Sequence, residues 1–280
     1  MPCRLAARAA ARLRPPPPRR ACLHTIAAMS TSTDPASTHP DLYPHGMASL
    51  TASTHPACAA PAILARLGAP SLPTPLPPAG SAFVRPLSLA YTLDGASKRW
   101  DMVRAHASVA CLLFHAGLRS VLLVRQFRPA VWECVRSEGL AATPPASTPP
   151  PPLAAGFTYE LCAGILDKPA LPPAAVAAEE VAEECGFRVD PSALEVVARF
   201  RTAIGISGAP HTIFYAAVTE ADRLPAAPGV GGGVEGEAIE TLALPVDRVD
   251  AFLADPALAR SAGLMYALAW LKARLRDGGA

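Results

Sequence analysis

Hydrophobic and polar positions follow a regular pattern only from about residue 83 onward. From there, short apolar runs of strand length are separated by turn residues, and Asp94-Gly95 is typical of a hairpin turn. The runs that predict strands are Phe83–Thr92, Lys98–Arg104, Ser108–Phe114, Ser120–Gln126, Phe157–Ala163, Leu194–Arg201, Thr212–Val218 and Ile239–Leu244. The first two runs predict one hairpin, and the next two predict a second, central hairpin.

Two further segments have the end signals or the periodicity of helices. Prolines at 172 and 173 stand where proline opens a helix, and Gly186 suits a C-terminal cap, which predicts a helix from about Pro173 to Cys185. A C-terminal amphipathic helix is predicted over Pro256–Arg274, and its inward positions are Leu258, Leu264, Leu268 and Leu271. Several strands with one central and one terminal helix make a mixed α+β core.

Composition separates this core from two segments of different character. The chain of 280 residues holds 32 prolines and 19 glycines, and the prolines are concentrated in 1–80 and 144–152. We predict that 1–80 is a disordered tail and that 81–280 is one domain. Within that domain, 138–156 is predicted to be a disordered, Pro-rich surface insert.

The first residues have the composition of a targeting segment. Residues 1–33 contain six arginines and no acid, and Arg4, Arg8 and Arg12 would share one face of a helix. An Arg-rich, acid-poor segment followed by Ser and Thr is typical of a transit peptide, so we expect delivery to a mitochondrion or plastid. The alternatives are an Ala/Arg-biased tail that targets nothing, or a cytoplasmic form that starts at an internal methionine.

Charge and cysteine spacing exclude several classes of protein. The net charge of +2 combines +5 in residues 1–80 with −3 in the remainder, so a basic nucleic-acid-binding domain is not indicated. The sequence has no uncharged apolar run long enough for a transmembrane helix, and its seven scattered cysteines include no C-x-x-C pair. We expect neither nucleic acid nor a membrane as partner.

Three carboxylates at helical spacing carry the candidate chemistry. Glu180, Glu183 and Glu184 are related as i, i+3 and i+4, so they share one face of the predicted helix next to Ala and Val. A divalent cation would relieve their mutual repulsion, and an all-carboxylate site suits Mg²⁺ or Mn²⁺. A solvated glutamate face on an Ala-rich helix is the alternative.

The sequence around these glutamates resembles the Nudix box. The segment EVAEECGF at 180–187 matches its E-U-x-E-E-x-G-U core, where U is a bulky apolar residue, and Gly164 opens the box. Glu179 stands where Nudix proteins usually have arginine, and Ala170 or Leu171 where they have a loop glutamate. The resemblance implies a Nudix-type α/β/α sandwich with a mixed sheet and a central catalytic helix. It also implies hydrolysis of nucleoside diphosphates linked to another group.

Further segments are similar to the UDP-sugar diphosphatase branch of this family, which lies close to the ADP-ribose diphosphatases. They are SKRWD at 97–101, VRQFRPAV at 124–131, YELCAG at 159–164 and AEECG at 182–186. This branch implies Mg²⁺-dependent cleavage of UDP-glucose to UMP and glucose 1-phosphate, with ADP-ribose as the second candidate substrate. It also implies a homodimer in which the N-terminal strands exchange contacts.

The resemblance implies a metal site as well. Glu180 and Glu184 match metal ligands of the family, and Glu183 is the third ligand or a base that acts through water. The carbonyl of Ala163 would add a backbone oxygen. Gly164, the next residue, allows the backbone to approach closely there.

A general base is expected from the Gly-rich stretch 224–238. Glu235 and Glu237 lie in it, and related enzymes bring a loop glutamate over the metal site when substrate binds. We prefer Glu237 slightly. Solvated loop charge is the alternative for both.

Four other residues are candidates for substrate binding. Arg128 follows the predicted strand and suits bidentate contact with the diphosphate, and Arg125, three residues earlier, is its neighbour on the alternate face. Trp100 could stack on a uracil or adenine ring, or contact a second subunit, or lie in the core. Glu160 is a candidate acceptor for ligand hydroxyl groups. A structural salt bridge is the alternative for Arg128.

Other readings of the chain stay open at this point. Because Glu179 replaces the usual arginine, a non-catalytic nucleotide-sugar sensor is a rival to the enzyme, and an interaction module built on the Pro-rich segments is a third possibility. The histidines His106, His115 and His211 lack metal-ligand spacing, so we interpret them as structural.

Overall fold

The computed structural model describes residues 48–49, 62–71, 73, 80–81, 84–138, 150–225 and 238–278. Its strands are β1 (Ala48–Ser49), β2 (Arg85–Leu93), β3 (Ala96–Arg104), β4 (Ser108–His115), β5 (Ser120–Phe127), β6 (Phe157–Glu160), β7 (Cys162–Ile165), β8 (Glu195–Thr202), β9 (Ala209–Val218), β10 (Ile239–Pro245) and β11 (Ala259–Arg260). Its α-helices are α1 (Pro129–Ser137), α2 (Pro173–Glu180), α3 (Val249–Ala254) and α4 (Ala262–Arg276). All the predicted strands form, and both predicted helices form with changed ends.

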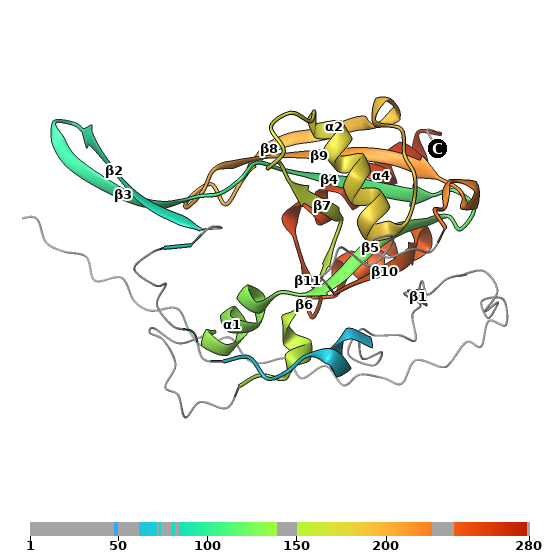
Figure 1. The fold of residues 1–280 in the computed structure, drawn as a ribbon, viewed down its shortest axis with the longest axis horizontal. Helices are drawn as coiled ribbons and strands as arrows, with labels where there is room; N and C mark the ends of the chain where they lie inside the picture. The colour runs from blue at the N-terminus through green and yellow to red at the C-terminus, as the bar shows by residue number, and fades with distance from the viewer. Residues whose placement is uncertain are drawn as a thin grey trace, which may run out of the picture. The chain divides into compact units, whose positions relative to one another are not determined.

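The main sheet is mixed and is built around the predicted central hairpin. Its main path runs β1-β10-β5-β4-β9-β8, with β5 antiparallel to both β4 and β10 and with β4 parallel to β9. Figure 1 shows β8, β9, β4 and β5 side by side behind α2. The hairpin strands β4 and β5 are almost entirely buried, because their apolar runs are covered on both faces.

The two strands of the central hairpin separate at their open end, and a third segment fills the gap. β4 pairs with β5 only near the turn, from Leu113↔Leu122 to His115↔Ser120. Farther along, β6 pairs with β5 and β7 pairs with β4, so the predicted strand Phe157–Ala163 is divided between two partners. Leu161 lies at the division. This arrangement brings β6 and β7 into the middle of the sheet and places β7 against the helix that carries the three glutamates.

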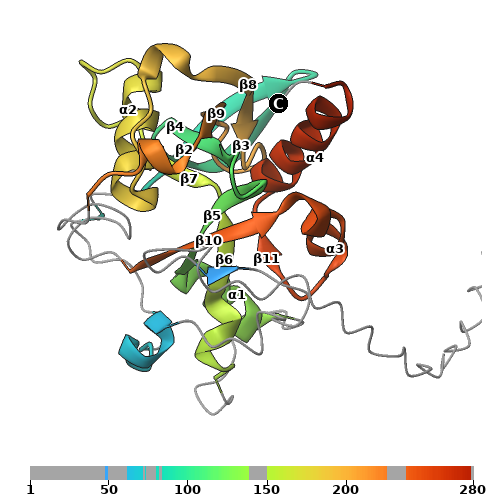
Figure 2. The ribbon, with the colours of Figure 1, turned by 90° about the vertical axis from the view of Figure 1, so that its right-hand side faces the viewer.

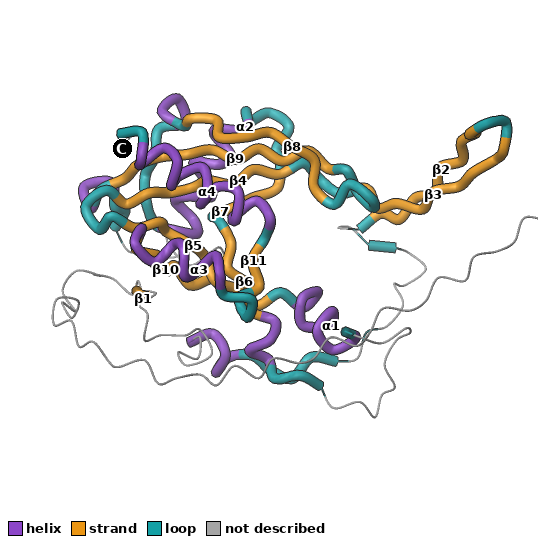
Figure 3. The backbone as a smooth tube through the Cα atoms, turned by 180° about the vertical axis from the view of Figure 1, so that it is seen from behind, coloured by secondary structure: helices purple, strands orange, loops and turns teal. Residues whose placement is uncertain are grey.

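Helices cover both faces of the sheet. Figure 2 shows α2 and α4 on opposite sides of the strands, and Figure 3 shows α4 lying across the face that α2 does not cover. The predicted inward leucines Leu264, Leu268 and Leu271 are fully buried, and each contributes roughly 2 kcal/mol of hydrophobic free energy. The layers are those of the predicted α/β/α sandwich, so the α+β fold class is confirmed.

The carboxylate helix changes its pitch in the middle. α2 is regular to Glu180, and Val181–Cys185 then forms a π-helical turn that ends at Gly186 in the left-handed conformation, with φ of 74°. The hydroxyl group of Thr241 on β10 donates to the Glu184 carbonyl at 3.0 Å and holds this turn against the sheet. A π-turn carries more residues per turn than an α-helix, so the glutamates do not share one face as simply as regular helical spacing predicts.

The helices differ from the sequence-based expectation in the start of α4 and in the presence of α1. The C-terminal helix begins at Ala262 rather than Pro256, because Ser261 caps it by accepting from the Leu264 amide and the preceding residues form β11. Helix α1 was not predicted, since its nine residues have only a short apolar period. Its first residue is a proline, which suits that position.

Part of the predicted Pro-rich insert 138–156 lies within the described residues. Residues 139–149 lie outside the described part, but 150–156 are placed and end in a 3₁₀ turn at Leu153–Gly156. The indole of Trp132 donates to the carbonyl of Pro151 at 3.2 Å, and the Arg128 amide donates to that of Gly156 at 2.8 Å. The expectation of disorder was wrong for 150–156, because Trp132 supplies an apolar surface for a segment that has little of its own.

The predicted N-terminal hairpin forms a separate two-stranded sheet. β2 and β3 pair along their full length, from Arg85↔Arg104 to Leu93↔Ala96. Leu87, Leu89, Tyr91 and Leu93 alternate along β2, so they share one face, and all are exposed. Two-stranded hairpins are marginally stable alone. Burial of the exposed apolar face of β2 against a partner would therefore stabilise the hairpin.

Within the described residues, no helix has both the length and the apolar character needed to cross a bilayer. The predicted tail 1–80 falls mostly outside the described residues, and so does the whole of the predicted targeting segment 1–33.

Gly156 generates a prediction about stability. A β-carbon at this position would overlap the Phe127 ring and lie 2.8 Å from Cβ of Trp132. We expect Gly156→Ala to destabilise the protein by about 1–3 kcal/mol, as overpacking does, and to lower the melting temperature by several degrees. Gly117→Ala is the matched control, because its β-carbon would meet only the His115 ring at 3.5 Å or more. Equal melting temperatures for the two variants would contradict the packing of this turn.

Candidate active site

The acidic end of α2 lies against the backbone of β7. Glu184 is only 5% exposed, and its Oε2 accepts a hydrogen bond from the Ala163 amide at 2.9 Å. Glu180 covers the α-carbon of Gly164, where any side chain would overlap its carboxylate. The two predicted metal ligands and the box glycine therefore meet at one place. Gly164 is required here for space rather than for an unusual backbone angle.

The β-ladder fixes where the carbonyl of Ala163 points. Leu166 donates to Ala107 at 2.8 Å, so every second pair of β7 and β4 is hydrogen-bonded and the Ala163–Ala110 pair is not. In such a pair, the N–H and C=O of a residue both point away from the neighbouring strand. Since the Ala163 N–H reaches Glu184, its carbonyl is directed to the same side as the carboxylates.

The oxygen atoms of Glu180, Glu184 and the Ala163 carbonyl are of the chemical type that a hard divalent cation prefers. Two carboxylates and a backbone carbonyl are the ligands that Mg²⁺ and Mn²⁺ prefer, and the third predicted carboxylate, Glu183, is half-buried on the same turn. Among the described residues, however, no three acidic, histidine or cysteine side chains come close enough to form a ligand cluster by themselves. Backbone oxygen and water would have to complete any such site.

A lysine compensates for the unusual Glu179. Nζ of Lys168, in the loop between β7 and α2, lies 2.6 Å from Oε2 of Glu179. This hydrogen bond, supported by the charges of Glu179, Glu183 and Glu180, raises the pKa of Lys168. A positive charge therefore stands beside the carboxylates although arginine is missing from the helix. Sequence reasoning missed it because the lysine is eleven residues away and no pattern connects the two.

Arg128 and Glu160 form a bidentate pair at the end of β6. Nε and Nη2 of Arg128 donate to the two carboxylate oxygens of Glu160, each at 2.8 Å, and the hydroxyl group of Thr158 donates to the same carboxylate at 2.6 Å. Burial would raise the pKa of Glu160, but these hydrogen bonds outweigh it and hold its pKa below the usual value. Arg128 remains 46% exposed, so its guanidinium is also accessible to a ligand.

Arg125 has a different role from the predicted one. Its side chain is buried and lies 2.7 Å from Glu240 on β10, and it also hydrogen-bonds to the hydroxyl group of Tyr159. Breaking such a buried pair is costly, because it leaves an unpaired charge in the interior. The structure therefore places Arg125 in the fold and not at a substrate surface.

Trp100 is neither buried nor in contact with the carboxylates. Its side chain lies on β3, is 50% exposed, and donates from Nε1 to the carbonyl of Gly205 at 3.0 Å. The core interpretation is therefore wrong, whereas stacking on a base and contact with a second subunit both remain. The predicted base candidates Glu235 and Glu237 lie outside the described residues.

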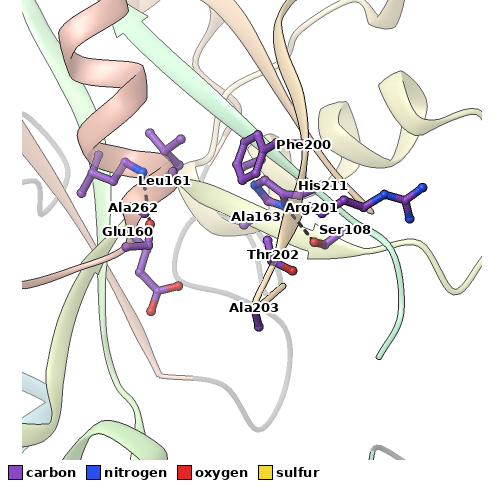
Figure 4. A pocket seen from close by; sticks show the side chains of 14 residues that line it. Ser108, Glu160, Leu161, Ala163, Phe200, Arg201, Thr202, Ala203, His211 and Ala262 are labelled. Atoms are coloured by element: carbon purple, nitrogen blue, oxygen red, sulfur yellow. Dashed lines mark hydrogen bonds between the residues drawn. The ribbon is translucent and has the colours of Figure 1, made fainter. Parts of the chain in front are cut away.

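A pocket of about 480 Å³ lies on the side of the sheet that carries α4, and one of its lining residues is Ala163, whose amide bonds Glu184. Its lining includes Glu160 and Ala163, together with Ser108, Phe200, Thr202 and His211 (Figure 4). No local sequence pattern predicts this pocket, because its residues come from six elements: β4, β6, β7, β8, β9 and α4. His211, for which the sequence predicts a structural role, contributes its ring to the pocket wall.

Comparisons with known proteins agree with this geometry. No protein-family model matches the chain. Proteins named uridine diphosphate glucose pyrophosphatase NUDT14 are similar to it: the Bos taurus protein is 42% identical over 200 residues, covering 69% of this chain and 89% of that protein, and the Mus musculus protein is 40% identical with the same coverage. A GDP-mannose pyrophosphatase of Cronobacter sakazakii is 32% identical over 161 residues, covering 55% of this chain and 71% of that protein.

One solved structure supports the fold separately. The crystal structure of an ADP compounds hydrolase superposes with a TM-score of 0.52 at 17% identity and covers 71% of this chain and 90% of that chain. At this level of identity the likeness shows the fold alone.

Gly164 provides a direct test of the carboxylate arrangement. In Gly164→Ala the added methyl would occupy the space of the Glu180 carboxylate, so the side chain must move, while the sheet can stay intact. We expect about tenfold or more weaker Mn²⁺ binding, measured by titration calorimetry on the full chain, with an unchanged circular dichroism spectrum. Gly117→Ala, in the turn after β4, is the control. Unchanged Mn²⁺ affinity in Gly164→Ala would refute this position for the cation.

Proposed function

The chain belongs to the Nudix hydrolases, and from this we propose that it hydrolyses the diphosphate bond of nucleoside diphosphate sugars, with UDP-glucose as the preferred substrate. The contact of Glu184 with the Ala163 amide carries the proposal, because it joins the Nudix helix to the strand that opens the box. The mammalian relatives that cover most of this domain are named for cleavage of uridine diphosphate glucose, which supports the choice of substrate.

We propose that Glu180, Glu184 and the Ala163 carbonyl hold Mg²⁺, with Glu183 as a further ligand or as a base acting through water. The cation would neutralise phosphate charge and lower the pKa of a nearby water. The chain itself contributes the close fit of Glu180 over Gly164 and the amide that orients Glu184. Orientation by a second group is what keeps a ligating carboxylate in one geometry.

Arg128 is the proposed diphosphate ligand. Its guanidinium already makes a planar, bidentate contact with the Glu160 carboxylate, and a phosphate presents similar oxygens. Glu160 fixes the plane of the guanidinium, and the Arg128 side chain as a whole is 46% exposed. Lys168 adds a second positive charge near the carboxylates through its bond to Glu179. Glu237, or else Glu235, remains the proposed general base.

The hairpin supports a homodimer as the proposed assembly. The exposed face of β2 carries Leu87, Leu89, Tyr91 and Leu93, and Trp100 of β3 is the register partner of Leu89 on the same face. A second copy of this chain is a suitable cover, because its own hairpin presents the same self-complementary apolar face. We also propose that residues 1–33 direct the protein to a mitochondrion or plastid, on their Arg-rich, acid-free composition.

Turnover by the full chain tests the proposed reaction. With Mg²⁺ present, we expect UDP-glucose to yield UMP and glucose 1-phosphate, resolved by chromatography. Glu184→Gln should lower kcat by about 10³-fold, since a ligand of a metal that supplies several kcal/mol is lost. Glu195→Gln, an exposed carboxylate paired with Arg274 on another surface, should leave the rate unchanged.

The same assay separates the alternatives. Cleavage of ADP-ribose or GDP-mannose but not of UDP-glucose would keep the reaction and overturn the preferred substrate. Binding of UDP-glucose without turnover of any of the three would make the protein a sensor and refute the enzyme.

The mass in solution tests the proposed assembly. Sedimentation of the full chain at micromolar concentration should give about 58 kDa, twice the 29.0 kDa of one chain. Leu89→Glu, which places a charge on the apolar face, should shift the protein towards the monomer, because an unpaired buried charge is costly. Ser88→Glu on the opposite face of β2 is the control. A monomeric full chain would overturn the dimer.

A further inference from the structure

The pocket beside Ala163 is joined to the proposed reaction centre by two residues. Ala163 lines the pocket while its amide holds Glu184, and Glu160 lines the pocket while its carboxylate holds Arg128. A diphosphate bound between these groups would place one of its two substituents at the pocket mouth. The volume of about 480 Å³ is within the range of pockets that hold small ligands.

Two of the polar side chains in this pocket form a pair. Oγ of Ser108 on β4 lies 2.7 Å from Nδ1 of His211 on β9, and the two residues are register partners in the parallel ladder. Among the described residues, none is hydrogen-bonded to the other ring nitrogen, Nε2. Figure 4 shows the His211 ring beside that of Phe200, with the bond to Ser108 dashed.

The Ser108–His211 pair has the chemistry that recognises a hydroxyl group. Burial lowers the pKa of His211, so the ring is neutral at pH 7 and has one donor and one acceptor nitrogen. The Ser108 hydroxyl group can donate to Nδ1 or accept from it, and Nε2 then donates or accepts in turn. A ligand hydroxyl group can donate to Nε2 or accept from it, so it can hydrogen-bond to either tautomer of His211.

The other walls suit the body of a sugar. Phe200 packs against His211 with ring centroids 5.1 Å apart, and Ala110 and Leu161 add apolar surface beside it. A pyranose combines apolar C–H groups with a rim of hydroxyl groups, which matches aromatic and polar walls at once. Trp100 does not line this pocket but exposes half of its side chain elsewhere, and a flat aromatic surface of that kind suits a nucleobase better.

We propose that the pocket receives the sugar of a nucleoside diphosphate sugar and that His211, oriented by Ser108, contacts one of its hydroxyl groups and helps to select the sugar. This inference rests on the proposed function. It concerns which sugar is accepted, whereas the carboxylates determine whether the diphosphate is cleaved at all.

Steady-state kinetics of the full chain on UDP-sugars that differ at one position test the proposal. The panel is UDP-glucose, UDP-galactose and UDP-xylose, and the variants are His211→Ala and His211→Gln. We expect His211→Ala to raise KM for the preferred sugar about tenfold with kcat changed less than about threefold, and to reduce the kcat/KM ratio between sugars at least about fivefold. His211→Gln, which keeps a hydrogen-bonding group, should recover part of the ratio.

Two controls separate a role in sugar contact from a structural one. His106→Gln alters an exposed histidine that does not line the pocket and should change neither KM nor the ratio. Inhibition by UMP should have the same inhibition constant in His211→Ala and in the unmodified protein, because the nucleotide lies outside the pocket. Weaker inhibition by UMP together with an unchanged sugar ratio would place the base in the pocket and overturn the proposal. Unchanged kinetics in His211→Ala would overturn it as well.

Failure of the proposed function can be distinguished from failure of the proposed sugar pocket. If the unmodified protein cleaves none of the UDP-sugars, the reaction is wrong, and the pocket is then tested by saturation-transfer NMR with glucose 1-phosphate. Contact signals that disappear in His211→Ala would support a sugar site without turnover. Their absence in the unmodified protein would refute the site.

Discussion

The hydrogen bond from the Ala163 amide to Glu184 is the interaction on which the site depends. It is possible because β4 and β5 separate and the β6–β7 segment enters between them, which leaves the Ala163 N–H and C=O without a strand partner. A backbone amide left inside a protein needs an acceptor, and a carboxylate is a strong one. The Ala163 amide at the open edge of β7 is therefore satisfied by the acidic π-turn, and the candidate metal ligands lie where the sheet is interrupted.

Charges around this centre are arranged in pairs that cross the fold. Arg128 faces Glu160, Lys168 faces Glu179, and the buried Arg125 faces Glu240. The exposed pairs contribute little to stability, but they set the local potential near the carboxylates. The buried pair ties β5 to β10, and β10 in turn holds the Glu184 turn through the hydroxyl group of Thr241. Positive charge close to a cluster of acids reduces their repulsion, and Lys168 supplies such a charge beside Glu179, which replaces the usual arginine.

Leucine, the same apolar residue type, has different surroundings in the interior and on the exposed hairpin. Leucines on α4 pack into the sheet and complete the core, whereas leucines on β2 remain on a surface that one chain does not cover. The hairpin touches the body through Trp100 and through the Val103 amide, which donates to the Ile206 carbonyl at 2.8 Å. The loop that receives these bonds follows β8, the strand that supplies Phe200 and Thr202 to the pocket. Hairpin and pocket are thus held by one loop.

The sequence by itself determined the strands, the helix with its three glutamates, and the family resemblance, because these depend on local periodicity and on close spacing. It also placed Gly164 beside Glu180, since the Nudix box contains both. Only the tertiary structure decided that Arg125 is a buried partner of Glu240, that Lys168 neutralises Glu179, and that Trp132 orders residues 150–156. The pocket that joins Ser108 to His211 likewise has no local signal. Each of these contacts pairs residues far apart in the chain, and long-range partners are selected by packing and by burial of charge, which no short pattern records.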